Sequence, residues 1–351
     1  MKKWRTLFCV ILASALTVST AACSSSGNHA TAANSSDASS DTAEASSSAE
    51  PIKIAISAWN PNVFMNLAQD LGYFDDAGVS VDLIDFAEFS DVPKAFNAGQ
   101  LDGAFFSSFE VIAPASLDMD IRLVSVIDDS VGADALLTRG GETSLQELKG
   151  KRIGVGMDTV SHIFLMLLAQ EEGCSLDDYE LVDFSSPSNG ATALVTGEID
   201  ALATFEPFIT SCMNADDSIS IVADTSAYPT MINDSIVFSG NILDTRFDDV
   251  VKVMECFYQA VDYWKENPDE ANEMLGKYLD CSGEEFAETM TKLNMLSAEE
   301  AYAQMTAEGD DSWTASMSAM SSFLLERGRI SQDIAPSDYV DTSVLAAITE
   351  N

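Results

Sequence analysis

Two stretches of the chain, Phe86–Ser107 (FAEFSDVPKAFNAGQLDGAFFS) and Phe184–Phe205 (FSSPSNGATALVTGEIDALATF), decide the fold. They align without a gap at an offset of 98 residues. Upstream of each lies a short apolar run, Lys53–Ser57 before the first and Arg152–Gly156 before the second, at an offset of 99. Self-similarity at a fixed period is the signature of a repeated structural unit. The sequence therefore predicts a duplicated half-domain.

Each copy predicts the order strand, helix, strand, helix, strand. The expected strands span 52–57, 79–85 and 102–107 in the first copy and 152–157, 179–184 and 200–205 in the second. Gly99 and Gly197 suit the residue just after a helix, where a left-handed backbone costs glycine nothing. Alternating strands and helices predict an α/β fold with parallel sheets covered on both faces. Ligands of such sheets bind beyond the carboxyl ends of the strands.

A helical tail follows the second copy, with helices expected at 248–266, 269–279, 283–294, 297–307 and 312–327. Apolar residues at helical spacing, such as Val250, Met254 and Phe257, support the first of them. Two equivalent halves and a tail predict two lobes joined by crossings near 134–140 and 236–243. We therefore expect lobe 1 to comprise 51–136 and 241–351, completed by the tail, and lobe 2 to comprise 137–240.

The amino terminus has the order of a secretory signal over residues 1–22, with basic Lys2, Lys3 and Arg5 before an apolar stretch. It ends Thr20-Ala21-Ala22-Cys23, which resembles a bacterial lipobox, although Thr20 stands where that pattern prefers Leu. The resemblance implies lipidation of Cys23; ordinary cleavage after Ala22 is the alternative. Residues 24–50 hold ten Ser among 27 positions and no large apolar residue, so we expect a disordered tether.

The formal net charge is −40, which argues against nucleic acid as a partner. Beyond Cys9 and Cys23, the cysteines are scattered, without a C-x-x-C spacing or a neighbouring His, so a metal site is not expected. These residues are Cys174, Cys212, Cys256 and Cys281. They are interpreted as buried thiols or at most one disulfide, and the sequence leaves that choice open.

Several motifs, taken in order, resemble the nitrate/sulfonate/taurine and thiamine-pyrimidine group of ABC solute-binding proteins. They are Leu71-Gly72-Tyr73-Phe74, Gly99–Ala104, Leu148–Val155, Gly197–Ala201 and Glu206-Pro207. The resemblance covers roughly 50–330. It implies a periplasmic-binding-protein fold of the second type, in which two doubly wound α/β lobes close on a ligand in the cleft between them.

Side chains at the ends of the first-copy strands are candidate ligand contacts. Trp59 follows the first strand and can stack on a planar ligand, with Asn60 beside it as donor and acceptor. The alternative for Trp59 is a place in the core of lobe 1. Ser107 and Ser108 follow the third strand and offer hydroxyl groups. Asp128, after the apolar run 123–127, can accept from an amino group or lie in a solvated loop.

The second copy offers a helix start and an acid. Thr159, Ser161 and His162 open an apolar helix, whose free backbone N–H groups and dipole favour an anionic group. The alternative is that these residues only cap the helix. Glu206, within a pattern that the family resemblance covers, can accept from an amino group. The predicted cleft has acids and no Arg or Lys, which favours a zwitterion or an aminopyrimidine over a bare anion.

We expect a non-catalytic receptor that captures a small organic solute, without cofactor, and presents it to an ABC permease and its ATPase. The lipid would hold it, as a monomer, on the outer face of a bacterial membrane. A pyrimidine-synthesis enzyme of the same fold is one alternative, but its family implies an iron-linked His/Cys-rich segment, and this chain has only His29 and His162. A lipoprotein that reports its ligand to a membrane receptor is the other.

Overall fold

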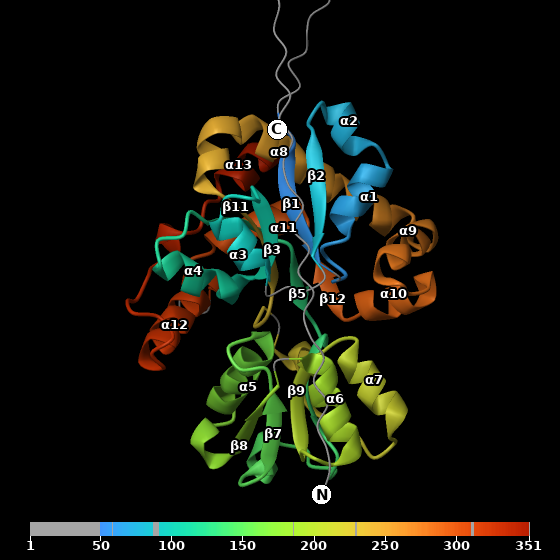
Figure 1. The fold of residues 1–351 in the computed structure, drawn as a ribbon, viewed down its shortest axis with the longest axis vertical. Coiled ribbons are helices and arrows are strands. Elements are labelled where there is room, and N and C mark those ends of the chain that lie inside the picture. Colours follow the sequence, from blue (N-terminus) through green and yellow to red (C-terminus); the bar gives the residue numbers. More distant parts are fainter. Residues whose placement is uncertain are drawn as a thin grey trace, which may run out of the picture. The chain divides into compact units, whose positions relative to one another are not determined.

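The computed structural model describes residues 50–57, 59–86, 91–184, 186–228, 230–309 and 312–350. The predicted signal peptide and, apart from Glu50, the predicted tether with Cys23 lie outside these residues. Two five-stranded sheets organise the described part, and helices flank each of them (Figure 1). The periplasmic-binding-protein type of fold expected from the sequence is confirmed.

The first sheet has the strand order β2-β1-β3-β11-β4. Its strands are β1 (Ile52–Ser57), β2 (Val81–Phe86), β3 (Gly103–Ser107), β4 (Arg122–Val126) and β11 (Asp234–Phe238). The second sheet has the order β10-β6-β9-β7-β8. Its strands are β6 (Asp134–Thr138), β7 (Arg152–Val155), β8 (Glu180–Asp183), β9 (Ala201–Phe205) and β10 (Ser220–Asp224). The six strands predicted from the two copies are all present, to within two residues at either end.

The predicted parallel arrangement holds only within the two copies. β1 runs parallel to β2 and β3, and β7 runs parallel to β8 and β9. β11 inserts antiparallel between β3 and β4, and β6 runs antiparallel to β9 and β10. Both sheets are therefore mixed, because each crossing segment enters its new sheet as an antiparallel strand.

The chain changes sheet earlier than expected. β6 already belongs to the second sheet and β11 to the first, whereas the expected boundaries lay after 136 and 240. Beside the first crossing, β5 (Asp128–Ser130) pairs with β12 (Leu293–Met295) in a two-stranded ribbon. The expected helix 283–294 is wrong over its end, since the helix stops at Met290 and the alternately buried Leu293–Met295 extend as a strand.

Helices of the tail pack on the first sheet. α8 (Gly240–Glu266) begins eight residues before the predicted start, where the Ser239 hydroxyl accepts from the backbone N–H of Ile242 (3.2 Å). It packs against α1 and α13, the latter a helix that the sequence analysis did not predict. The remaining helices are α1 (Phe64–Asp70), α2 (Tyr73–Ala77), α3 (Val92–Asn97), α4 (Ile112–Ser116), α5 (Val160–Glu171), α6 (Pro187–Thr196), α7 (Phe208–Ala215), α9 (Pro268–Gly276), α10 (Gly283–Met290), α11 (Ala298–Thr306), α12 (Trp313–Glu326) and α13 (Ser343–Thr349).

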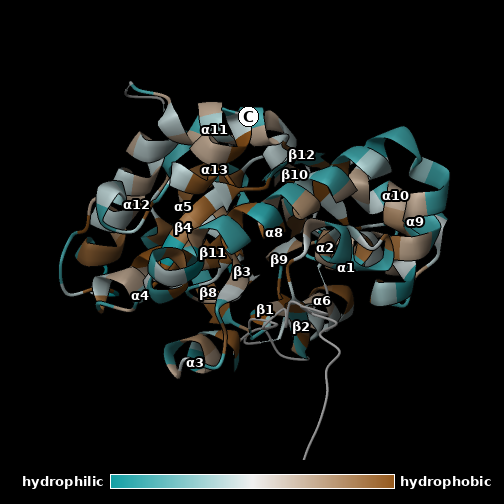
Figure 2. Cartoon of the chain, turned by 90° about the horizontal axis from the view of Figure 1, so that it is seen from above, coloured by the Kyte–Doolittle hydropathy of each residue, from teal (hydrophilic) through white to brown (hydrophobic). Residues whose placement is uncertain are grey.

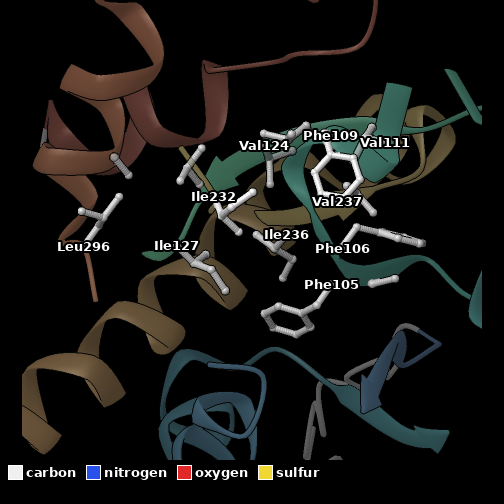
Figure 3. Close-up of a cluster of buried hydrophobic side chains, with 14 of the residues drawn as sticks. Phe105, Phe106, Phe109, Val111, Val124, Ile127, Ile232, Ile236, Val237 and Leu296 are labelled. Carbon is white, nitrogen blue, oxygen red and sulfur yellow. The ribbon is translucent and has the colours of Figure 1, made fainter. Parts of the chain in front are cut away.

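Burial of apolar side chains on both sheets drives the packing. One cluster includes Phe105, Ile127 and Ile236, which Figure 3 shows beside one another. In Figure 2 the outer helices α9 and α10 are largely hydrophilic, whereas β4 and β11 are largely hydrophobic. A second cluster, with Leu137 and Leu202, lies between the second sheet and helices α6 and α7. The strand ends are thereby fixed on rigid layers.

Candidate functional site

A cavity of about 570 Å³ is lined by both sheets and by the segments between them. From the first sheet come the residues after β1 and β3 and those at the start of β11. From the second come the residues after β7 and β8, the inner part of β9, and Asp134 at the start of β6. The lining is Ser57, Trp59, Asn62, Phe86, Pro93, Phe105, Phe106, Ser107, Glu110, Asp128, Ser130, Asp134, Gly156, Thr159, Val160, Ser161, Phe184, Pro187, Gly190, Leu202, Ala203, Thr204, Phe205, Ile232, Asn233, Asp234 and Leu293. The cavity thus lies where parallel sheets of this type bind ligands.

Four carboxyl groups line the cavity, those of Glu110, Asp128, Asp134 and Asp234. They reach it from different places along the chain: a turn after β3, the ribbon strand β5, the first residue of β6 and the first residue of β11. Among the described residues that line the cavity, none is Lys, Arg or His. The site is therefore strongly acidic without an internal counter-ion.

Asp234 is the centre of this group. Its carboxylate accepts hydrogen bonds from the Trp59 indole N–H (2.6 Å) and from the Ser107 hydroxyl (2.9 Å). Its backbone N–H donates to the Asp128 carboxylate (2.9 Å). The Ser107 backbone N–H donates to the Glu110 carboxylate (3.2 Å). Three segments that are distant in the sequence thus meet at one half-buried acid.

Burial shifts the protonation of these acids. Burial, together with the neighbouring charge of Asp234, raises the pKa of Glu110 and that of Asp134 to about 7. Burial, followed by the charge of Asp234, raises the pKa of Asp128 well above its usual range. The pKa of Asp234 is also raised by burial, although the bonds from Trp59 and Ser107 work against the rise. Glu110 and Asp134 can therefore exchange protons near neutral pH.

The opposite wall belongs to the second sheet. Thr159 is the residue before α5, and its hydroxyl donates to the Gly156 carbonyl (2.8 Å) instead of capping the helix. Ser161 lies in the first turn and is buried. The first turn of α5 thus faces the cavity, and its backbone N–H groups give that wall a partial positive charge. Phe205 lies edge-on to Trp59, with ring centroids 6.1 Å apart, so the two lobes touch beside the site.

The predicted site residues divide into two groups. Trp59, Ser107, Asp128, Thr159 and Ser161 line the cavity together. The remaining four, Asn60, Ser108, His162 and Glu206, are buried outside its lining.

His162 and Glu206 have other partners. The His162 ring accepts from the Asp158 backbone N–H (3.3 Å), and burial lowers the pKa of His162. His162 lines a second cavity, with Asp158 and Arg329. Glu206 forms an ion pair with Lys292 and accepts from the Thr210 backbone N–H (3.1 Å) and hydroxyl (2.9 Å). Its charge is therefore balanced by a lysine that the sequence analysis did not place near the cleft.

Glu110, Asp134 and Asp234 are lining acids that sequence reasoning missed. Asp134 and Asp234 each begin an antiparallel strand, and no local pattern in the sequence indicates how β6 and β11 pair. The signal that was available is an acid directly before a short apolar run, as in Asp234-Ser235-Ile236-Val237. That signal is weak, because acids before strands also occur in solvated loops.

The described part of the chain shows neither a cluster of metal-ligating side chains nor a disulfide. No group of three or more His, Cys, Asp or Glu there could hold a metal ion. The cysteines expected to be thiols or one disulfide are all free, namely Cys174, Cys212, Cys256 and Cys281. No helix within the described ranges is long and apolar enough to cross a membrane.

Residues 60–271 match the family model described as NMT1/THI5 like. The chain belongs to this family. A binding protein of Brucella abortus is 25% identical over 295 residues, which is 82% of this chain and 89% of that protein. The 4-amino-5-hydroxymethyl-2-methylpyrimidine phosphate synthase of Aspergillus parasiticus is 29% identical, over 38% of this chain and 39% of the enzyme. Proteins similar to this chain thus include both a binding protein and an enzyme, and the resemblance inferred from the motifs is confirmed.

The fold has a solved counterpart. The periplasmic aliphatic sulphonate binding protein SsuA from Escherichia coli superimposes with a TM-score of 0.71 at 13% identity, covering 84% of this chain and 92% of SsuA. At this identity the likeness establishes the fold, a periplasmic binding protein with two α/β lobes. A binding-protein role agrees with this likeness and with the Brucella relative.

Proposed function

We propose that this NMT1/THI5-like protein is the extracytoplasmic solute-binding receptor of an ABC importer. The observation that carries the proposal is the cavity of about 570 Å³, lined by strand ends of both sheets. Its size suits a small organic molecule. The candidate solutes are those indicated by the sequence, either sulfonate-, taurine- or nitrate-like or aminopyrimidine-like.

The mechanism follows from the two-lobed lining. A solute that contacts Ser107 in the first lobe and Ser161 in the second has its full set of contacts only when the lobes are closed. Binding therefore shifts the population toward the closed form. That form would dock on a membrane permease, and ATP hydrolysis by the partner ATPase would drive release. No step needs a catalytic residue.

The amino terminus completes the proposal. Cleavage of residues 1–22 and lipidation of Cys23 would hold a monomeric receptor at the outer face of a bacterial cell membrane, at the end of the tether 24–50. A globomycin-sensitive shift in mass of the expressed chain, lost on Cys23→Ala, is the expected sign of lipidation. If Cys23→Ala still showed the globomycin-sensitive shift in mass, lipidation of Cys23 would be contradicted.

The central test is solute capture by the cleft. Thermal unfolding of the protein is measured with taurine, alkyl sulfonates, nitrate and aminopyrimidines, and the radius of gyration is measured for each hit. A solute at 100 times its dissociation constant adds about 2.7 kcal/mol of stability. We expect a hit to reduce the radius of gyration, as closure requires.

Variants locate the binding. Trp59→Ala and Ser161→Ala remove one contact from each lobe and should weaken binding of the hit. Ser318→Ala, on the exposed face of α12, is the matched control and should bind normally. Unchanged affinity in both Trp59→Ala and Ser161→Ala would show that the cavity is not the binding site.

A further inference from the structure

Building on the proposed receptor function, we propose that the cavity selects a solute with a cationic N–H group, an ammonium or an amidinium, held by Asp128, Asp234 and Asn62. The rest of this solute is a small, flat, apolar body. The proposal rests on unpaired acceptors, on the charge of the lining and on the shape of the walls.

Two buried acceptor oxygens on the lining residues lack a donor. Oδ2 of Asp128 has no hydrogen-bond partner in the described part of the chain, although the residue is 1% exposed. Oδ1 of Asn62 also has none, at 3% exposure, while its amide nitrogen donates to the Ser57 hydroxyl (2.8 Å). A buried acceptor left unpaired costs about 1–3 kcal/mol, so native sites supply a donor to it. Both residues line the cavity, so a bound solute is the donor that the site lacks.

The charge of the lining gives the sign of the solute. Four carboxyl groups face the cavity, and the described lining holds no basic side chain. The basic groups nearby are already engaged, since Lys292 pairs with Glu206 and Arg329 pairs with Asp158 (2.9 Å). An anion would meet the carboxylates with no compensating cation, whereas a cation converts them into charge-assisted hydrogen-bond acceptors.

The walls orient such a solute. The positive end of the α5 dipole repels a cationic group, so the cation is directed to the side of β5 and β11. The lining also holds the aromatic side chains of Phe86, Phe106, Phe184 and Phe205. Aromatic faces attract flat apolar groups and cations alike. The acidic side of the cavity therefore selects the charge of the solute, and the aromatic side chains select its shape.

The protonation of the lining carboxyl groups agrees with a cationic solute. Burial raises the pKa of Glu110 and of Asp134 to about 7, so part of the charge is neutralised by protons in the absence of ligand. A bound cation favours the ionised forms and must displace those protons. Binding of the cation should therefore release protons and strengthen as the pH rises from 6 to 8.

The experiment uses matched probes on the full chain. Benzylammonium and benzamidinium carry the cationic group, benzyl alcohol is the neutral match, and benzenesulfonate is the anionic match. Calorimetry at pH 8, in two buffers of different ionisation enthalpy, measures affinity and proton release. We expect the two cations to bind at least about tenfold more tightly than the other probes, with release of protons.

Asp128→Asn and Asp234→Asn keep the shape and remove one charge each. Loss of one charge-assisted hydrogen bond should weaken cation binding about tenfold to a hundredfold. Asp129→Asn is the control, because that neighbouring buried carboxylate accepts from Gln304 (3.0 Å) and is not in the cavity lining. It should bind the cations like the unmodified protein.

Two outcomes overturn the proposal. Binding of benzenesulfonate or benzyl alcohol as tight as that of the cations, with the same loss in Trp59→Ala, would reject the cation and leave the receptor function in place. If neither cation bound, the assignment of the carboxylates would be rejected. It would also be rejected if Asp128→Asn and Asp234→Asn bound the cations as tightly as the control Asp129→Asn. Failure of the receptor function itself would appear separately, as a lack of closure with every solute of the wider panel.

Discussion

The ion pair between Lys292 and Glu206 allows a quantitative test of how the second lobe is held. It joins the end of β9 to the residue before β12, 86 positions apart in the sequence. Glu206 is 1% exposed, whereas the side chain of Lys292 is 28% exposed. Thr210 gives the Glu206 carboxylate two further hydrogen bonds. The pair is therefore buried at one end and accessible to water at the other.

The expected cost follows from this asymmetry. Removing one partner of a fully buried pair costs about 3–5 kcal/mol of unfolding free energy, because a buried charge remains unpaired. In Lys292→Met, the two Thr210 donors still reach the Glu206 carboxylate, so we expect a loss of about 2–3 kcal/mol. Glu206→Gln leaves a lysine that can turn to solvent and should cost about 1 kcal/mol. The double variant should recover much of the loss of Lys292→Met, since it removes both charges.

Urea denaturation of the four proteins, followed by tryptophan fluorescence, measures this cycle. Lys149→Met is the control, because its pair with Asp178 (2.8 Å) is 47% and 41% exposed and should leave the stability nearly unchanged. A loss below about 0.5 kcal/mol in Lys292→Met, or a double variant no more stable than Lys292→Met, would refute the reasoning. Weakened solute binding with unchanged stability in Glu206→Gln would instead support the ligand contact predicted from the sequence.

Three further predictions test the site and its surroundings. The folded-state pKa of Glu110 and of Asp134, about 7, lies above the unfolded value of about 4, so the contribution of each group to the stability of the unliganded protein should be greatest below about pH 4 and should fall by about 2–3 kcal/mol per group between pH 5 and pH 8; urea denaturation across this range measures the fall, and an equal slope in Glu110→Gln/Asp134→Asn would contradict it. Trp59→Phe removes the donor to the Asp234 carboxylate (2.6 Å) and should cost about 1.5–3 kcal/mol of stability at pH 8, measured by the same method, with a cost near zero as the contrary result. Arg329→Ala breaks a pair whose side chains are both 45% exposed and should lower the thermal midpoint by under about 2 °C; a larger drop would show that this pair holds the lobes together.

The repeated halves were predictable because local pattern and duplication agree. Strand β1 was predicted with its observed bounds, and the helix before Gly197 ends as expected, with that glycine at φ 76°. Each strand of a copy is a short apolar run bounded by turn residues, and the second copy checks the first. The fold can be predicted from the sequence where the local pattern of each strand and the duplication of the half-domain agree.

The rest depends on contacts that local patterns do not contain. β12 is three residues long, and Leu293–Met295 continue the apolar spacing of α10, so only its pairing with β5 makes it a strand. The sequence predicts only a crossing at the position of β11, because nothing near Asp234 indicates that this strand inserts between β3 and β4. Lys292 is likewise brought to Glu206 only by the ribbon.

The same division explains why the fold is easier to predict than the solute. The sheets are specified by buried side chains within the strands, whereas the cavity is lined mainly by residues at or beyond the strand ends. Asp128, Asp134 and Asp234 each occupy the first position of a strand, so their side chains can change without altering the sheet cores. Fold and specificity can therefore diverge. A protein of this architecture whose name records a sulphonate ligand, and this chain, whose cavity lining holds four carboxyl groups, are thus compatible members of one fold.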